Sequence, residues 1–438
     1  MGKFWKIVKQ STFLWTLLFV ALANYAAGTV NPLSPVPHSQ IPALQLSESA
    51  LTFKFECLSN LPAAPEVTLL GSSLPMCAFY YSDGDKLVRQ LEKITAPRGL
   101  NLMQSYPEAK YFRSQLKRQF AKDPTVFNFT TAACMPSDAR LLLMRMIEKR
   151  RQPQVLIYGL GLRDFVDNVN PPPGQTPAFR ALCDASYLAH NASVVTAAAA
   201  RTELALASLS QVYRLKDQFH LLMESSLCRE FKRQTNLERA FANIDREREQ
   251  KKRALATSKA SETAPATENG NIEPPNQPHK PNSINSAPLF AGTKAKPGRQ
   301  QPALATPTLP TSPSTLSLLD YPARYNPPNY KQLAREMTEL NKIVDVCQAN
   351  GIKLVLVNMP VSAGHKTLSA PGLRQTYLAN LQGLAAQHSI PIIDFENNHI
   401  FAEKDFLDTV HLSNDGAKKM IADLLKGLER CGIVSTLH

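Results

Sequence analysis

The chain has 438 residues, of which 44% are hydrophobic, and its 49 Lys and Arg against 36 Asp and Glu give a formal net charge of +13. A mean hydropathy of −0.21 excludes a polytopic membrane protein. The positive charge favours an anionic neighbour such as phospholipid headgroups or an acidic glycan. Nucleic acid is not expected as a partner, because the sequence has no RNP, zinc-finger or helix-turn-helix signature. The seven cysteines show no CxxC or Cys/His ligand spacing, so neither a metal site nor another cofactor is expected.

Residues 1–28 have the pattern of an export segment. Three lysines within the first nine residues precede an uncharged, mostly apolar run from 12 to 28. This run reaches the lower limit of the about 17–25 residues needed to span a membrane, and its basic flank predicts that the remainder is exported. We expect a signal anchor at 1–28, with a cleaved signal peptide as the alternative, and a Pro-rich spacer at 29–48. The protein would then be a single-pass protein of the inner membrane with its main domain in the periplasm.

Two stretches of the chain, 49–180 and 323–438, alternate short apolar runs with helical patterns. Such runs of four to six residues are typical of buried strands, and they occur at 67–70, 126–129, 155–158, 353–357 and 391–394. The alternation predicts an α/β fold of three layers, in which a sheet of about five parallel strands is covered by helices on both faces. Ser137 and Asn329 are expected to be the N-caps of two of these helices.

The part between the two stretches has a different character. Residues 181–257 are mostly helical in pattern, and their mixed-sign charges favour a solvated helix face, with a basic membrane-surface or partner helix as the alternative. Residues 258–322 are rich in Pro, Ser and Thr and poor in aromatic residues. We expect them to be a disordered linker, because they cannot bury enough apolar surface to offset their conformational entropy. The two flanking stretches would then form one interrupted domain.

Polar residues follow several of the predicted strands. The sequence GSSL at 71–74 follows the first strand, and its serines can act at a catalytic edge or merely cap a helix. A loop of small residues follows the second strand, and it permits the close backbone approach that a main-chain oxyanion donor needs. The sequence GLRD at 161–164 follows the third strand, where an ordinary surface Arg–Asp pair is the alternative.

Asp408 and His411 lie three residues apart, just before an amphipathic helix near the C-terminus. A carboxylate at this spacing can hold one imidazole nitrogen while the other faces a nucleophile. Such a pair alone is more often a surface or capping pair. The carboxyl ends of parallel strands share one edge of the sheet, where ligands bind in open α/β folds. The order of the motifs along the chain therefore favours a serine hydrolase.

These stretches together resemble the sequence blocks of the SGNH (GDSL-type) hydrolase superfamily. The matching sequences are GSSL at 71–74, NFTTAACMPSDA at 128–139, GLRD at 161–164 and DTVHLSNDG at 408–416. The chain most resembles an uncharacterised subfamily of membrane-anchored proteins of the bacterial envelope, which share Gly-x-Arg-Asp and a strand ending in Asn-Met-Pro, as at 358–360. More distantly, it is similar to proteins that O-acetylate exported polysaccharides or D-alanylate teichoic acids.

The resemblance implies a flavodoxin-like fold with the active site at the carboxyl ends of its strands. In that site Ser73 would be the nucleophile, His411 its base and Asp408 the residue that orients the imidazole. The oxyanion would bind to the amides of Ser73 and the second-block loop, at Ala133, and to the side chain of Arg163.

The sequence departs from the family pattern at two of these positions. Ala133 replaces the usual glycine, and Arg163 replaces the usual asparagine. Arg163 would either stabilise the oxyanion, bind an anionic group of the substrate or pair with Asp164. We count Arg163, Asp164 and Asn358 as candidate substrate-binding residues.

The function expected from these features is that of a membrane-anchored, extracytoplasmic serine esterase or O-acyltransferase. It would act on cell-envelope polysaccharide or on a lipid-linked substrate, with an envelope glycan or an acyl-donor protein as partner. The alternative is a catalytically degenerate SGNH domain that binds glycan or scaffolds an envelope assembly.

Overall fold

The computed structural model describes most of the two strand-bearing stretches and part of the region between them. The described residues are 12–29, 32, 43–84, 102–172, 174–191, 194–195, 198–223, 226, 321–397 and 400–437. The chain divides into two compact units, of which the second, residues 229–309, lies outside these ranges. The predicted linker at 258–322 also lies outside them up to residue 320.

The sheet has five parallel strands, one at each of the predicted positions. They are β1 (Val67–Gly71), β2 (Val126–Asn128), β3 (Val155–Leu160), β4 (Lys353–Asn358) and β5 (Ile392–Asp394). Their order in the sheet is β2-β1-β3-β4-β5, which is the flavodoxin-like order. The parallel register pairs Gly71 with Gly159 and Asn358 with Asp394, so the carboxyl ends of the strands lie along one edge.

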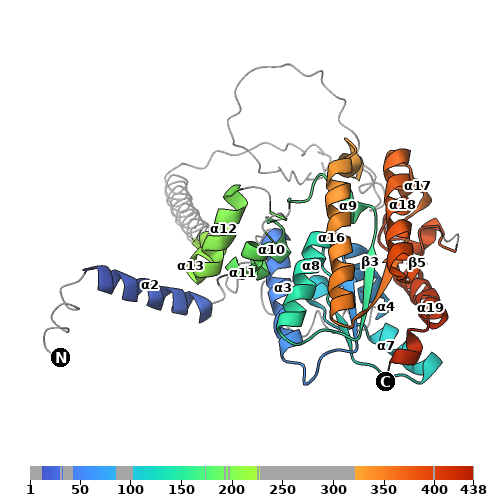
Figure 1. The fold of residues 1–438 in the computed structure, drawn as a ribbon, viewed down its shortest axis with the longest axis horizontal. Coiled ribbons are helices and arrows are strands. Elements are labelled where there is room, and N and C mark those ends of the chain that lie inside the picture. Colours follow the sequence, from blue (N-terminus) through green and yellow to red (C-terminus); the bar gives the residue numbers. More distant parts are fainter. Residues whose placement is uncertain are drawn as a thin grey trace, which may run out of the picture. The chain divides into compact units, whose positions relative to one another are not determined.

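Helices cover both faces of the sheet, which confirms the predicted three-layer α/β fold (Figure 1). One layer contains α4 (Ser73–Ser82), α7 (Lys110–Phe120) and α19 (Asn414–Arg430), and the other contains α8 (Pro136–Glu148), α16 (Tyr330–Ala349) and α18 (Pro371–His388). Every residue of β1 and β3 is buried between these layers. The apolar stripe predicted for α19 is also buried, at Met420, Ile421, Leu424, Leu425 and Leu428.

The two predicted helix caps have different outcomes. The Asn329 side chain accepts a hydrogen bond from the amide of Gln332 at 3.0 Å, which confirms it as the N-cap of α16. The prediction for Ser137 was wrong, because the cap of α8 is Met135 and Pro136 occupies the first helical position. Proline favours that position, where its missing N–H is not needed. The helix therefore begins one residue before Ser137.

The structure also describes helices outside these two layers. They are α2 (Thr12–Thr29), α3 (Ala43–Ser59), α6 (Leu102–Ser105), α9 (Arg163–Val166), α10 (Pro177–Leu182), α11 (Ala185–His190), α12 (Ala198–Leu209), α13 (Gln211–Arg214) and α17 (Ala363–Lys366), with the short 3-10 helices η2 (Glu403–Asp405) and η3 (Val434–Thr436). Because α3 begins at Ala43, the folded part starts within the predicted spacer at 29–48. Within the described ranges, no helix has both the length and the apolar character needed to cross a membrane. The export segment at 1–28 stays a prediction.

The turn between β1 and α4 requires glycine at position 71. Gly71 has a φ of +139°, and a Cβ there would lie 2.1 Å from the carbonyl oxygen of Gly159 and 2.7 Å from Cγ of Pro75. Backbone strain and overpacking each cost about 1–3 kcal/mol. The absence of a side chain therefore lets β1 turn directly into α4, which places Ser73 at the edge of the sheet.

We expect Gly71→Ala to lower the free energy of unfolding by about 3 kcal/mol or more, because it adds both strain and a backbone clash. Urea unfolding followed by circular dichroism measures this. The matched control is Gly383→Ala in the exposed interior of α18, where a Cβ would meet no atom within 4 Å. That change should stabilise by up to about 1 kcal/mol. Similar effects of the two substitutions would contradict the account of this turn.

Candidate active site

Ser73 is the first residue of α4, at the carboxyl end of β1. Ser72 is the N-cap, and its hydroxyl accepts a hydrogen bond from the amide of Leu74 at 3.4 Å. The amides in the first turn of a helix have no acceptor within the helix, and the helix dipole places partial positive charge there. Negative charge that develops at Ser73 is therefore stabilised by the helix itself.

The structure brings Ser73, His411 and Asp408 together in a hydrogen-bonded chain. The Nε2 atom of His411 lies 3.0 Å from Oγ of Ser73, and its Nδ1 lies 2.7 Å from Oδ2 of Asp408. The other carboxylate oxygen of Asp408 accepts hydrogen bonds from the amides of Val410 and His411. Residues far apart in the sequence thus have the arrangement of a Ser-His-Asp triad.

Asp408 remains ionised in this arrangement. Burial by itself raises the pKa of its carboxyl, but the hydrogen bond and charge of His411, together with two main-chain amides, lower the pKa to about 2. An ionised carboxylate only accepts hydrogen bonds. The Nδ1 atom of His411 must therefore carry the proton, which leaves Nε2 free to accept the hydroxyl proton of Ser73.

The loop that carries Asp408 and His411 is fixed at several points. Leu407 donates its amide to the carbonyl of His411 at 2.7 Å, and Ser413 caps α19. A second set of contacts joins this loop to His365. The hydroxyl of Thr409 lies 3.0 Å from Nδ1 of His365, and Nε2 of His365 lies 2.7 Å from the hydroxyl of Tyr325. Burial is the main cause that lowers the pKa of His365 to about 3, so this imidazole is neutral. Sequence reasoning missed His365, because no motif surrounds it.

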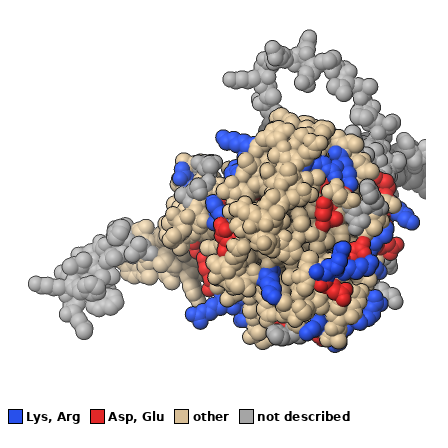
Figure 2. Space-filling model, turned by 45° about the vertical axis from the view of Figure 1, so that its right-hand side comes forward, with Lys and Arg blue, Asp and Glu red and all other residues tan. Residues whose placement is uncertain are grey.

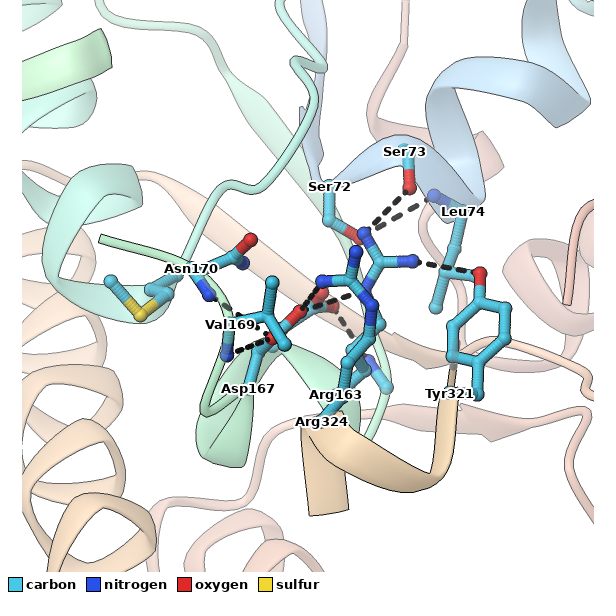
Figure 3. Close-up of polar contacts among 12 residues, drawn as sticks. Ser72, Ser73, Leu74, Arg163, Asp167, Val169, Asn170, Tyr321 and Arg324 are labelled. Carbon is cyan, nitrogen blue, oxygen red and sulfur yellow. Dashed lines mark hydrogen bonds and ion pairs between the residues drawn. The ribbon is translucent and has the colours of Figure 1, made fainter. Parts of the chain in front are cut away.

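Arg163 lies beside the nucleophile (Figure 3). Its Nη2 is 3.4 Å from Oγ of Ser73, its Nη1 donates to the hydroxyl of Tyr321 at 3.0 Å, and its Nε lies 3.3 Å from Oδ2 of Asp167. The guanidinium is largely buried, with 11% of the side chain exposed. It can therefore donate a charge-assisted hydrogen bond to an oxyanion attached to Ser73.

The carboxylate that holds Arg163 is Asp167, and among the described residues no ion pair joins Arg163 to Asp164. Asp167 is completely buried, and its Oδ2 also lies 2.5 Å from Nη1 of Arg324. Two guanidinium groups thus share one carboxylate. The spacing of Arg163 and Asp167, four residues apart, is a sequence signal for a helical ion pair. Tyr321 and Arg324 have no such signal, because only the fold brings them to this place.

Two of the candidate substrate-binding residues are internal. Asp164 is 3% exposed, and its carboxylate accepts the amide of Gly161 at 2.9 Å. Asn358 is fully buried, and it is bonded to Asp394, Glu396 and Tyr377. The structure therefore assigns both side chains to holding the strand ends in place, and of the three candidates only Arg163 reaches the nucleophile.

Ala133 has a backbone conformation that glycine adopts more readily, which fits the glycine found at this position in the SGNH pattern. Its φ is +57°, a region that residues other than glycine rarely adopt. The loop that contains it approaches the nucleophile turn, since the amide of Thr131 donates to the carbonyl of Gly71 at 2.9 Å. Among the described residues, no hydrogen bond joins Ala133 to Ser73. The donors that the structure places at Ser73 are its own amide and Arg163.

The fold and this geometry define a three-layer α/β protein with a Ser-His-Asp arrangement at the carboxyl edge of its sheet. A family model described as "Protein of unknown function (DUF1574)" matches residues 106–428, and the chain belongs to this family. The matched range includes Arg163, Asp408 and His411 and begins after Ser73. No curated protein matches the chain.

We expect Asp167→Asn to lower the free energy of unfolding by about 3–5 kcal/mol, because it leaves a buried guanidinium without its carboxylate. The asparagine can still accept the amides of Val169 and Asn170, so the change mainly removes charge. The control is Arg324→Gln, after which Asp167 keeps Arg163 and the loss should be smaller. Urea unfolding measures both, and equal stability of the two variants would contradict the role of Asp167.

The buried carboxyl of Asp164 predicts a pH-dependent stability. Burial, the largest influence, raises its pKa to about 7 against the lowering effects of Arg163, Ser72 and the Gly161 amide. Because the unfolded pKa is about 3.9, the folded state retains a proton that the unfolded state has lost. The free energy of unfolding should therefore fall as the pH rises from about 4 to 7.

The Asp164→Asn variant should lose less stability than the wild type over the same rise in pH, as measured by urea unfolding near both ends of that range. Asp123 provides the control, because it is exposed and its pKa is lowered by Lys117 and Arg113. The Asp123→Asn variant should show at least the full fall of the wild type, because a carboxyl with a lowered pKa adds stability as the pH rises from about 4. An identical fall in all three proteins would show that Asp164 does not bind the extra proton.

Proposed function

We propose that this protein is a membrane-anchored serine esterase or O-acyltransferase of the SGNH type. The observation that carries the proposal is the chain from Ser73 through His411 to Asp408, with distances of 3.0 and 2.7 Å. The site lies between β1 and β3, where the strand order reverses. Ligands of open α/β sheets bind at such a switch point.

The reaction begins when Oγ of Ser73 attacks the carbonyl carbon of an ester, while its proton passes to Nε2 of His411. The ionised Asp408 stabilises the resulting imidazolium. The oxyanion accepts hydrogen bonds from the amide of Ser73 and from Nη2 of Arg163. When the ester C–O bond breaks, His411 returns the proton to the leaving alcohol, and an acyl-serine remains.

The second half of the reaction releases the acyl group. A hydroxyl attacks the acyl-serine carbonyl, His411 takes the proton of that hydroxyl, and the proton then returns to Ser73 as the acyl bond breaks. Water as the attacking group makes the protein an esterase, and a sugar hydroxyl makes it an O-acyltransferase. The residues at Ser73 serve both reactions, so the identity of the acceptor decides between them.

The basic net charge and the apolar segment after the N-terminal lysines support a location at the membrane. They favour an enzyme held at the inner membrane and acting in the periplasm on cell-envelope polysaccharide or a lipid-linked substrate. An envelope glycan or an acyl-donor protein would be its partner. A degenerate SGNH domain that only binds glycan is the alternative, and the complete hydrogen-bonded triad favours catalysis over it.

We expect the 438-residue protein to release p-nitrophenol from p-nitrophenyl acetate in a rapid burst, because the activated phenyl ester should acylate Ser73 faster than water removes the acyl group. Stopped-flow absorbance measures the burst, whose amplitude should approach one equivalent per chain. Ser73→Ala and His411→Ala should abolish it. Added oligosaccharide acceptors should speed the following phase if the protein is a transferase.

The control variants are Ser114→Ala on the exposed side of α7 and His388→Ala at the end of α18, which should keep the full burst. Each variant is first checked for folding by circular dichroism. A burst that persists in the folded Ser73→Ala variant would overturn the proposal. Folded wild-type protein without a burst would favour the glycan-binding alternative.

A further inference from the structure

A small cavity lies beside the proposed nucleophile. Its lining includes Leu74, which follows Ser73, Val410, which precedes His411, and Arg163, whose Nη2 lies 3.4 Å from Oγ of Ser73. The cavity volume is about 20 Å³, compared with the roughly 10–15 Å³ that one water molecule needs. A group of carboxylate size therefore fits, whereas a sugar ring does not.

Part of the cavity wall is rich in hydrogen-bond donors. Lys366, at the end of α17, Ser369 and Arg374, in the first turn of α18, all line it together with Glu396. The hydroxyl of Ser369 has no hydrogen-bond partner in the described part of the chain, although the residue is 7% exposed. A ligand here meets an unused hydroxyl and two cationic side chains.

The hydrogen-bond acceptors of Glu396 in this wall already have donors from the protein. Glu396 lies 2.6 Å from Nη2 of Arg374, and its other oxygen accepts from the side chain of Asn358 at 3.1 Å. Lys366 donates to the main-chain carbonyl of Glu396 at 2.5 Å, an acceptor without net charge. Nearby Asp394 is bonded to Asn358 and Asn397 and does not line the cavity. The free hydrogen-bonding capacity of the wall therefore lies in its donors.

We propose that Lys366, Ser369 and Arg374 form a subsite for a carboxylate that the substrate carries close to its reactive ester. This inference rests on the proposed function, and it narrows the substrate class to acidic substrates. An acceptor-rich, negatively charged group matches the donors in both charge and hydrogen bonding. On the face drawn in Figure 2, basic and acidic side chains are interspersed among uncharged residues. The drawn face therefore has no continuous basic patch that would by itself favour acidic substrates.

The first test does not depend on catalysis. Isothermal titration at constant ionic strength compares sodium succinate, its neutral analogue succinamide and inorganic phosphate, with the full-length protein. Succinate should bind at least about tenfold more tightly than succinamide, and Ser369→Ala and Lys366→Gln should remove this difference. The control is Lys426→Gln on the exposed face of α19, which should leave binding unchanged. Arg374 is kept, because its loss would leave Glu396 without its ion-pair partner.

The second test uses two pairs of esters, with the charge on the acyl side in one and on the alcohol side in the other. The pairs are p-nitrophenyl hemisuccinate with p-nitrophenyl butyrate, and 3-acetoxybenzoate with 3-acetoxybenzamide. The charged member of at least one pair should have a kcat/KM about tenfold higher or more, and the preference should vanish in Ser369→Ala and Lys366→Gln but persist in Lys426→Gln. The pair that shows the preference identifies the side that carries the carboxylate.

The two tests separate the failure of this inference from the failure of the proposed function. If no ester is hydrolysed but succinate binds as described, the subsite stands and the esterase proposal fails. If esters are hydrolysed with no preference for charge, and succinate binds no better than succinamide, the subsite is overturned. Phosphate that binds more tightly than succinate, and loses affinity in the same variants, would also overturn the assignment to a carboxylate.

Discussion

The parallel pairing of β1 with β3 is the constraint on which the candidate site depends. Gly71 and Gly159 are partners in this pairing, and the two backbones approach so closely at this point that a side chain on Gly71 would meet the carbonyl of its partner. One strand then leads to Ser73 and the other to Arg163. Because parallel strands end along the same edge, the pairing brings a hydroxyl and a guanidinium into one crevice.

Charge inside this crevice is arranged around a few carboxylates, of which Asp167 and Glu396 are buried and Asp408 is partly buried. Asp167 forms ion pairs with two arginines, Asp408 is hydrogen-bonded to one histidine, and Glu396 forms an ion pair with Arg374. Removing ionised groups from water is costly unless each one is paired and hydrogen-bonded. The cost is reduced here because each carboxylate also accepts hydrogen bonds from amide groups of the protein. The guanidinium of Arg163 is thereby held still beside Ser73, which is what preorganised stabilisation of an oxyanion requires.

Much of the fold was predictable from local patterns. The five apolar runs form strands whose residues are mostly buried, completely so in β1 and β3, and the stripe on α19 is buried as its spacing indicates. The N-cap at Asn329 was predicted correctly from its side chain. The prediction of Ser137 was wrong, because Pro136 is the first residue of α8 and the Asp138 side chain bonds the amide of the cap residue Met135. The helix α3 was not predicted, because its first residues lie in a stretch whose composition indicates a spacer.

The sequence by itself determined the strand positions and the layered fold, because these depend on local periodicity. Its short motifs indicated Ser73, Asp408 and His411 through their resemblance to the SGNH blocks. Only the tertiary structure decided which side chains surround that triad. Tyr321, Arg324 and His365 reach the site through long-range packing, for which local sequence carries no signal. Asn358 and Asp164, which are equally polar, turn inward because their partners lie on neighbouring strand ends and loops. Whether a polar residue faces the crevice or the core depends on contacts that form only when the whole sheet assembles.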